Sequence, residues 1–265
     1  MEQDPGAFQG QNQPGSPLDE ELARVQRIIT LLQEQGIVLR LIGGLAIRLR
    51  CSSASHQALE RSYSDVDFVA YKKQSRALRD ALPANGYTAD RHFNALHGDR
   101  RLLFIDEAHK RHIDVFLDVF EMCHKLSLDQ KLELHALTLS PADLLLTKLQ
   151  IVQLNRKDIQ DILALLLDFQ PVEASQRPGE EIDIRAITNL CAQDWGWFTT
   201  VTDNLDRIPK EAAQLLNGDE ANLVAHRAGI IKTSLVNAPK SSKWRLRSLA
   251  GRRIPWYELP EEVDE

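Results

Sequence analysis

Apolar residues near the start of the chain recur at the spacing of a helix. Leu22, Val25, Ile28, Ile29 and Leu32 fall on one helical face. The stretch Ser16 to Asp19 supplies an N-cap, a proline at the first helical position and an acid at the third. Gly36 is a typical helix end. The pattern therefore predicts a helix from Ser16 to Gly36.

The next hundred residues mix strand-like and helix-like patterns. We predict strands at 37–42, 65–71, 101–105 and 112–120, and helices at 45–51 and 72–84. The segment 52–64 reads as a polar loop, and His97-Gly98-Asp99 as a hairpin turn. Interleaved strands and helices predict an α+β (α/β) fold, with a mixed β-sheet flanked by helices.

The second half of the chain is predicted to be helical. Ser140 and Asn155 are N-cap residues for two helices that reach Phe169, and 170–182 reads as a linker. Further helices are expected at 182–190, 195–205, 211–216 and 222–236. The predicted organisation is a disordered tail (1–15), a catalytic domain (16–169), a C-terminal helical module (170–257) and an acidic tail (258–265).

Composition narrows the classes of protein that fit. With 43% hydrophobic and 26% charged residues, the chain reads as a soluble globular protein. No apolar run approaches the ~20 residues of a membrane span, and the N-terminus lacks the pattern of a signal peptide. Three widely spaced cysteines indicate a reducing, cytoplasmic location and no zinc site.

The distribution of charge indicates one further candidate, a nucleic-acid-binding segment. The net charge of −6 argues against a protein coated with nucleic-acid-binding surface. One local strip, from Lys240 to Arg253, holds six basic residues and no acids. A solvated helix is favoured over an RNA-binding strip at this position.

The stretch Asp65-Val66-Asp67 is the clearest chemical signal. Two carboxylates two positions apart on a strand project from the same face. Such a pair repels unless a divalent cation neutralises it. Upstream, Gly43-Gly44 closes a strand and opens a helix, where backbone N–H groups can approach a phosphate.

Taken alone, each signal has an ordinary structural explanation. Acids at strand ends often lie in solvent, and most diglycines are turns. The ordered set Gly43-Gly44, Asp65/Asp67 and a third strand acid favours a metal site. Asp114 and Asp118 are the candidates for that third acid, and both have apolar neighbours on the predicted strand.

In this order, the motifs resemble those of the nucleotidyltransferase superfamily related to DNA polymerase β. The resemblance covers residues 37–169, with a longer interval than usual between Gly44 and Asp65. It implies a Mg²⁺ or Mn²⁺ site formed by Asp65, Asp67 and Asp114, with Asp114 also accepting a proton from the attacking hydroxyl. It further implies a nucleoside triphosphate held near Gly43 and Gly44.

A second motif resembles the AbiEii-type toxin branch of that superfamily. Lys148 is followed by Arg156, Lys157, Asp158 and Asp161 across the two predicted helices. The resemblance implies that Lys148 meets nucleotide phosphates and that Asp158 helps to position them. The alternative is that Arg156, Lys157 and Asp158 are solvent-exposed residues at the start of a helix, without a role in binding.

The sequence therefore predicts a cytoplasmic, metal-dependent nucleotidyltransferase that moves a nucleoside monophosphate from a triphosphate to a hydroxyl. The acceptor is an RNA or tRNA end, a protein side chain or a small molecule. A toxin–antitoxin or phage-defence role, with an antitoxin partner, follows only from the AbiEii resemblance. The alternatives are a catalytically silent nucleotide- or partner-binding protein on the same fold, and an RNA-binding protein that uses the strip from Lys240 to Arg253.

Overall fold

Five strands from the first half of the chain form one mixed sheet. The structure is a computed structural model that describes residues 16–259. The strands are β1 (Leu39–Ile42), β2 (Val66–Ala70), β3 (Thr88–Ala89), β4 (Arg101–Asp106) and β5 (Arg111–Leu117). Their order is β1-β2-β5-β4-β3; β2 and β5 are parallel and every other pair is antiparallel. The predicted mixed sheet flanked by helices is confirmed.

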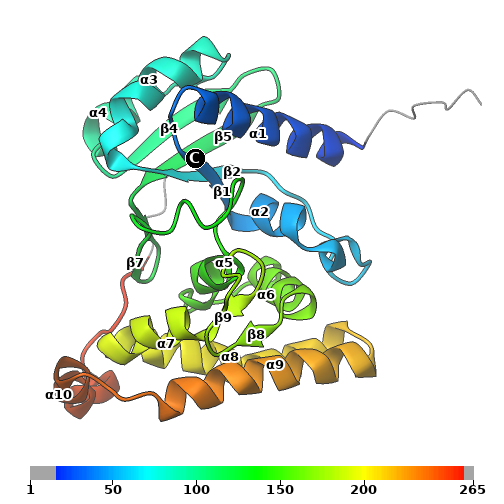
Figure 1. Ribbon diagram of the computed structural model, residues 1–265, viewed down its shortest axis with the longest axis vertical. Helices are drawn as coiled ribbons and strands as arrows, with labels where there is room; N and C mark the ends of the chain where they lie inside the picture. Colours follow the sequence, from blue (N-terminus) through cyan, green and yellow to red (C-terminus); the bar gives the residue numbers. More distant parts are fainter. Residues whose placement is uncertain (1–15, 260–265) are drawn as a thin grey trace, which may run out of the picture.

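Helices from the same half pack with this sheet. They are α1 (Pro17–Glu34), α2 (Gly43–Arg50), α3 (Ser75–Ala84) and α4 (Arg91–His97). Figure 1 shows α1, α3 and α4 with the sheet in the upper part of the molecule, and α2 lower, toward the second half of the chain. As predicted, Ser16 caps α1: its hydroxyl accepts from the Asp19 N–H, and Asp19 accepts from the Ser16 N–H.

Two predictions for the sheet region are wrong. His97, Gly98 and Asp99 do not form a hairpin turn, because the preceding residues are helical in α4, which Asp90 caps. The predicted strand 112–120 is broken at Asp118, where φ is +60°. Beyond the break, β6 (Val119–Glu121) pairs instead with β7 (Lys125–Ser127). The Asp118 carboxylate accepts from the Lys72 N–H at 3.0 Å, so this residue does not extend the face of Asp114.

The second half is helical, as predicted. Its helices are α5 (Pro141–Leu149), α6 (Arg156–Asp168), α7 (Ile184–Gln193), α8 (Trp195–Leu215), α9 (Gly218–Asn237) and α10 (Ser242–Ala250). Ser140 and Asn155 are the N-caps of α5 and α6. The stretch predicted as a linker contains two short parallel strands, β8 (Pro171–Val172) and β9 (Ile182–Asp183). The two helices predicted between 195 and 216 are one helix, because the buried face that contains Leu205 and Ile208 continues past Pro209 to Ala212.

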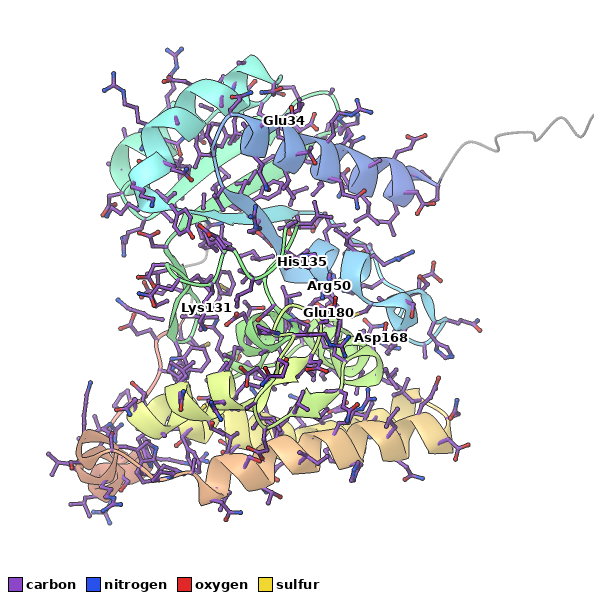
Figure 2. All side chains as sticks on the ribbon, in the orientation of Figure 1. Glu34, Arg50, Lys131, His135, Asp168 and Glu180 are labelled. Atoms are coloured by element: carbon purple, nitrogen blue, oxygen red, sulfur yellow. The ribbon has the colours of Figure 1, made fainter. Side chains whose placement is uncertain are left out.

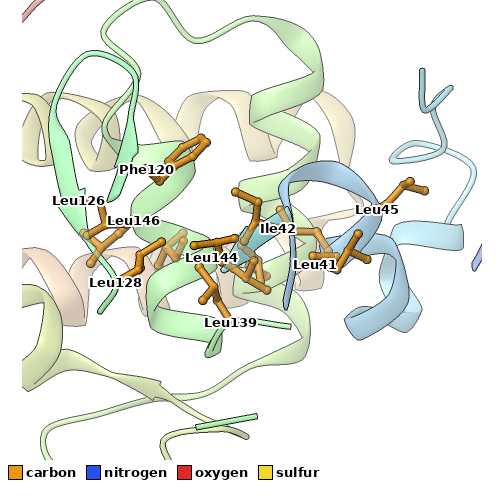
Figure 3. Close-up of a cluster of buried hydrophobic side chains, with 14 of the residues drawn as sticks. Leu41, Ile42, Leu45, Phe120, Leu126, Leu128, Leu139, Leu144 and Leu146 are labelled. Carbon is orange, nitrogen blue, oxygen red and sulfur yellow. The ribbon is translucent and has the colours of Figure 1, made fainter. Parts of the chain in front are cut away.

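One hydrophobic core joins the two halves. Figure 3 shows side chains of β1 and α2 packed with those of α5 and the β6–β7 hairpin, among them Leu41, Ile42, Leu45, Phe120, Leu126, Leu144 and Leu146. Burial of each such side chain contributes roughly 1.5–3 kcal/mol. No helix within residues 16–259 is long and apolar enough to cross a membrane. The predicted division at residue 169 stays a prediction, because α5 and α6 pack on α2 as well as on the later helices.

Arg50, at the end of α2, provides a polar link between the halves. Its guanidinium donates to Thr138 Oγ1 at 3.4 Å and lies 5.2 Å from the ring centroid of Phe169. Figure 2 shows Arg50 beside His135 and Glu180, in the region between the sheet and the lower helices. The position of α2 relative to the helical half is therefore fixed by polar contacts and by packing.

Candidate active site

The turn between β1 and α2 lies directly against one of the predicted carboxylates. Ile42 is the register partner of Asp67, so the chain turns into α2 immediately beside that residue. Gly43 makes the turn with φ at +68°, a conformation that disfavours any side chain. A Cβ at Gly43 would lie 2.5 Å from Asp67 Oδ2. Glycine is thus required at position 43 both by the backbone and by the carboxylate above it.

Sheet pairing brings two of the three predicted acids together. Asp67 on β2 and Asp114 on β5 are register partners in the parallel pair, so their side chains leave the same face of the sheet. Asp65 precedes β2 by one residue and is exposed, and its Oδ2 accepts from Ser64 Oγ at 2.8 Å. Asp67 and Asp114 thus form the centre of the site, and Asp65 lies at its edge.

The electrostatics of this face are unbalanced toward negative charge. Burial and, to a lesser degree, the neighbouring carboxylates of Asp114 and Asp65 together raise the pKa of Asp67 to about 7, against the opposing effect of Lys148 and Arg101. Arg101, one strand away, places its Nε 2.7 Å from Asp114 Oδ1. A bound cation would favour the ionised form of Asp67.

The carboxylates do not converge fully as they stand. Within residues 16–259, no three His, Cys, Asp or Glu side chains are grouped closely enough to hold a metal ion. The predicted metal role of Asp65, Asp67 and Asp114 therefore stays a prediction. It requires the exposed Asp65 side chain to turn toward the other two.

Gly44 is covered by Arg61, which is not among the residues predicted for the site. A Cβ at Gly44 would collide with the guanidinium of Arg61. Arg61 is held by Asp161, to which its Nε and Nη2 donate at 3.0 and 2.8 Å, and it lies 4.4 Å from the ring centroid of Tyr63. The only signal in the sequence is an arginine four positions before Asp65, at the end of the long insert.

The insert itself is folded against α6. The Ser53 N–H donates to Asp168 Oδ2 at 3.1 Å, and Gln160 Nε2 donates to the Ala58 carbonyl at 3.2 Å. The short 3₁₀ helix Ser52–Ser55 also packs on α6. These contacts carry the chain back toward α2 and place Arg61 over Gly44.

Lys148 and Asp158, the predicted phosphate-binding pair, contact each other. Lys148 Nζ lies 3.1 Å from Asp158 Oδ1 and 2.9 Å from Asp161 Oδ2. Burial lowers the pKa of Lys148, but the attraction of Asp161 and Asp158 outweighs it and raises the pKa above its usual value. Asp158 also accepts from the Asn155 N–H as part of the N-cap of α6. Their role toward a nucleotide stays a prediction, and their contacts with each other stabilise the start of α6.

Lys148→Met is expected to destabilise the fold by about 3 kcal/mol, because it leaves the buried carboxylate of Asp158 without a cation and leaves Asp161 with Arg61 alone. The measurement is urea unfolding at pH 7. Lys125 offers the matched control, since it makes a similar ion pair with Glu121 at 2.9 Å but is largely exposed. Lys125→Met should change stability little. Equal losses in the two variants would contradict a structural role for the buried ion pairs of Lys148.

Comparison with known proteins gives one informative match. A family model described as a nucleotidyltransferase of unknown function (DUF6036) matches residues 18–170. No curated protein matches the chain.

Several solved structures have detectable but weak similarity, JHP933 and LnuA among them. JHP933 from Helicobacter pylori has 13% identity and a TM-score of 0.38, covering 91% of this chain and 100% of that chain. The lincosamide antibiotic adenylyltransferase LnuA, solved with lincomycin bound, has 15% identity and a TM-score of 0.37, covering 54% of this chain and 94% of that chain.

The family match spans more than half of the 265 residues and includes every predicted site residue from Gly43 to Asp158. Membership of the nucleotidyltransferase superfamily, expected from the diglycine and the strand acids, is thereby confirmed. The chain belongs to the family of nucleotidyltransferases of unknown function.

Proposed function

We propose that the protein is a metal-dependent nucleotidyltransferase that transfers a nucleoside monophosphate from a nucleoside triphosphate to a hydroxyl group. The hydroxyl oxygen attacks the α-phosphorus and forms a new P–O bond. The bond between the α-phosphorus and the bridging oxygen breaks, and pyrophosphate leaves. The hydroxyl proton passes to a carboxylate of the site, for which Asp114 is the proposed acceptor.

A single observation carries this proposal: Asp67 and Asp114 lie side by side on parallel strands, and the Gly43 turn lies directly against Asp67. The α2 N-terminus at this turn supplies backbone N–H groups and a favourable field for phosphate. Two carboxylates and a glycine turn at a helix N-terminus thus meet at Asp67, an arrangement suited to holding a triphosphate beside a metal ion.

The donor set fits Mg²⁺ or Mn²⁺. Carboxylate oxygens are the preferred ligands of hard divalent cations, and Asp67 lies beside a second carboxylate, Asp114, on the neighbouring parallel strand. We assign the ligand role to Asp65, Asp67 and Asp114. When bound, the cation would neutralise charge on the triphosphate and on the leaving pyrophosphate. Gly43 and Gly44, with Lys148 and Asp158 behind them, are proposed to position the triphosphate.

The acceptor proposed here is an RNA end, in the cytoplasm, where nucleoside triphosphates and RNA occur together. A toxin or phage-defence role with an antitoxin partner rests on the spacing of Lys148, Asp158 and Asp161 alone. It is a secondary part of the proposal.

A catalytically silent nucleotide-binding protein is the second candidate. Two observations favour it: Arg101 already pairs with Asp114, and residues 16–259 contain no preformed group of three metal ligands. This candidate predicts calorimetric binding of a triphosphate with Mg²⁺ and no turnover.

The test is transfer of label from each of the four α-³²P nucleoside triphosphates, with Mg²⁺ or Mn²⁺, to total RNA or lysate protein. We expect the full chain to label one class of acceptor and Asp65→Ala/Asp67→Ala to label none. Glu34→Ala is the control, because Glu34 is an exposed carboxylate at the end of α1, at the top of the molecule in Figure 2. Equal labelling by wild type and the double variant, or no labelling with any nucleotide, would refute the enzymatic proposal.

A further inference from the structure

All four tryptophans of the chain line one cavity. Trp195, Trp197, Trp244 and Trp256 surround a space of about 450 Å³. It lies between the β6–β7 hairpin, the start of α8, α10 and the segment 255–258. Figure 1 shows β7 and α10 on the left side of the molecule. This volume is in the range of small-ligand sites. The cavity contains none of the proposed metal ligands.

The rings are arranged so that part of their surface stays open. Trp197 is 3% exposed and packs 5.1 Å from His124, which forms the floor. Burial lowers the pKa of His124 to about 4, so this floor is uncharged at neutral pH. Trp195, Trp244 and Trp256 are only half-buried, and Trp195 and Trp256 meet edge to face at 6.1 Å. Half-open aromatic rings around a cavity are suited to stacking with another planar ring.

Half of the basic strip beside this cavity is engaged in holding the fold together. Lys240 donates to the carbonyl of Leu235 at the end of α9, Arg247 donates to the Gly251 carbonyl, and Arg252 pairs with Asp203. Lys243, Arg245 and Arg253 form no hydrogen bond or ion pair through their side chains with any residue from 16 to 259, and all three are exposed. Lys243 also lines the cavity. Arg245 and Arg253 do not line it, and its lining also contains the cations Lys125 and Arg247 and the acids Glu121, Asp194 and Glu258. Lys243, Arg245 and Arg253 are thus the basic residues of the strip that residues 16–259 leave without a side-chain partner, with Lys243 at the cavity and the other two elsewhere on the same segment.

A purely structural role explains only part of this. Arg247 lies 4.7 Å from the Trp195 ring and Arg252 lies 5.2 Å from the Trp256 ring, so the aromatic rings do fix the segment after α10. That role does not use Lys243, Arg245 or Arg253. Bases that stack on aromatic side chains, with basic residues along the backbone, are the general mode of single-stranded nucleic acid binding.

The cavity is also linked to the helix that carries Lys148. The His124 N–H donates to Gln150 Oε1 at 3.1 Å, just after α5, two residues beyond Lys148. The floor of the cavity is therefore attached to the same helix end as the proposed nucleotide site.

We propose that this cavity binds an unpaired base of a single-stranded RNA end, and that Lys243, Arg245 and Arg253 contact the phosphates of that strand. The assignment of this strand as the acceptor rests on the proposed nucleotidyltransferase function. Binding itself does not require that function.

Intrinsic tryptophan fluorescence tests the proposal directly, because every tryptophan lies at the cavity. The full chain, without metal or nucleoside triphosphate, is titrated with an oligoadenylate of about six nucleotides and, separately, with AMP. We expect the oligonucleotide to quench fluorescence. Its affinity should fall roughly 10- to 20-fold between about 50 and 200 mM KCl, as three phosphate contacts predict.

Substitutions of the cations and of an aromatic ring separate the contributions of these two groups to RNA binding. Lys243→Ala/Arg245→Ala/Arg253→Ala should weaken binding about tenfold and flatten the salt dependence. The charge-matched control is Arg27→Ala/Arg76→Ala/Arg91→Ala, which removes three exposed cations elsewhere and should bind as wild type does. Trp195→Ala should weaken binding by about tenfold or more, and Trp195→Phe should restore most of it. Circular dichroism checks that each variant is folded.

The outcomes are distinct from those of the labelling experiment. No quenching by the oligonucleotide, or equal and salt-independent quenching by AMP, overturns the inference. Asp65→Ala/Asp67→Ala should bind the oligonucleotide as wild type does. Binding of the oligonucleotide without any nucleotide transfer would refute the proposed enzymatic function and support the RNA site. Nucleotide transfer to RNA without fluorescence quenching would refute the RNA site alone.

Discussion

Asp67→Asn is expected to abolish nucleotide transfer and, in metal-free buffer, to stabilise the fold. Loss of a carboxylate that binds the catalytic cation should cost about 4 kcal/mol of transition-state stabilisation, or roughly a thousandfold in rate. The same change removes a half-buried negative charge that lies beside Asp114 and is coupled to Asp65. A variant that is more stable but inactive would distinguish a functional residue from a structural one.

The pH dependence of this stabilisation has a definite sign. The pKa of Asp67 in the folded protein, about 7, lies above its ordinary value, so the unfolded chain loses this proton first as pH rises. The resulting penalty on wild-type stability is absent below pH 3.8, grows from there to pH 7 and is complete above pH 7. Asparagine does not titrate, and the variant should therefore gain ~1–3 kcal/mol over wild type at about pH 8 and less at about pH 5.

The measurement is urea unfolding of both proteins at these two pH values, with EDTA and with Mg²⁺. Mg²⁺ should stabilise wild type and have little effect on Asp67→Asn, because only the wild type keeps all three carboxylates. Retained nucleotide transfer in the variant, or a variant less stable than wild type in EDTA at pH 8, would contradict this account of Asp67.

Local signals in the sequence were sufficient for most of the fold. Ser16, Ser140 and Asn155 cap helices within three residues of themselves, so their effect does not depend on tertiary structure. The strand that carries Asp67 was predictable because its apolar positions are buried against the core. The helix α4 was missed, since it is only seven residues long and has a single buried residue, Asn94.

The sequence predicted some contacts of the candidate site and missed others. Asp67 and Asp114 could be grouped because the order of the motifs resembles that of the nucleotidyltransferase superfamily, and the parallel pairing of their strands places them on one face. The contact of Arg61 with Gly44 could not, because it depends on how a long insert folds on α6. The pairing of Arg101 with Asp114 depends likewise on the register between β4 and β5.

Asp118 shows where the alternation of side chains along a strand fails to predict which face of the sheet a residue occupies. Its spacing from Asp114 places it on the same face of an unbroken strand, yet a left-handed residue is rarely expected at a non-glycine position. The break at Asp118 redirects the chain into the β6–β7 hairpin, which forms one wall of the tryptophan-lined cavity. Asp114 and the cavity residues Glu121 to Lys125 therefore lie on either side of this break in the chain.

Gly43→Ala is the second change with a large expected effect, because it acts on the turn and on Asp67 together. A methyl group at this position would lie 2.5 Å from Asp67 Oδ2, so the carboxylate must move away from the α2 N-terminus. We expect nucleotide transfer to fall by about a hundredfold or more, since small displacements of catalytic groups have effects of that size. The positive φ adds a cost of roughly 1 kcal/mol to stability.

Gly36→Ala is the matched control for the backbone term. Gly36 has φ at +76°, close to the +68° of Gly43, but a Cβ there meets no atom within 4 Å. Both variants should lose similar stability to left-handed strain, measured by urea unfolding, while only Gly43→Ala loses nucleotide transfer at saturating metal and triphosphate. If Gly36→Ala lost as much activity as Gly43→Ala, the loss would come from global strain. The contact between the glycine turn and Asp67 would then have no specific part in catalysis.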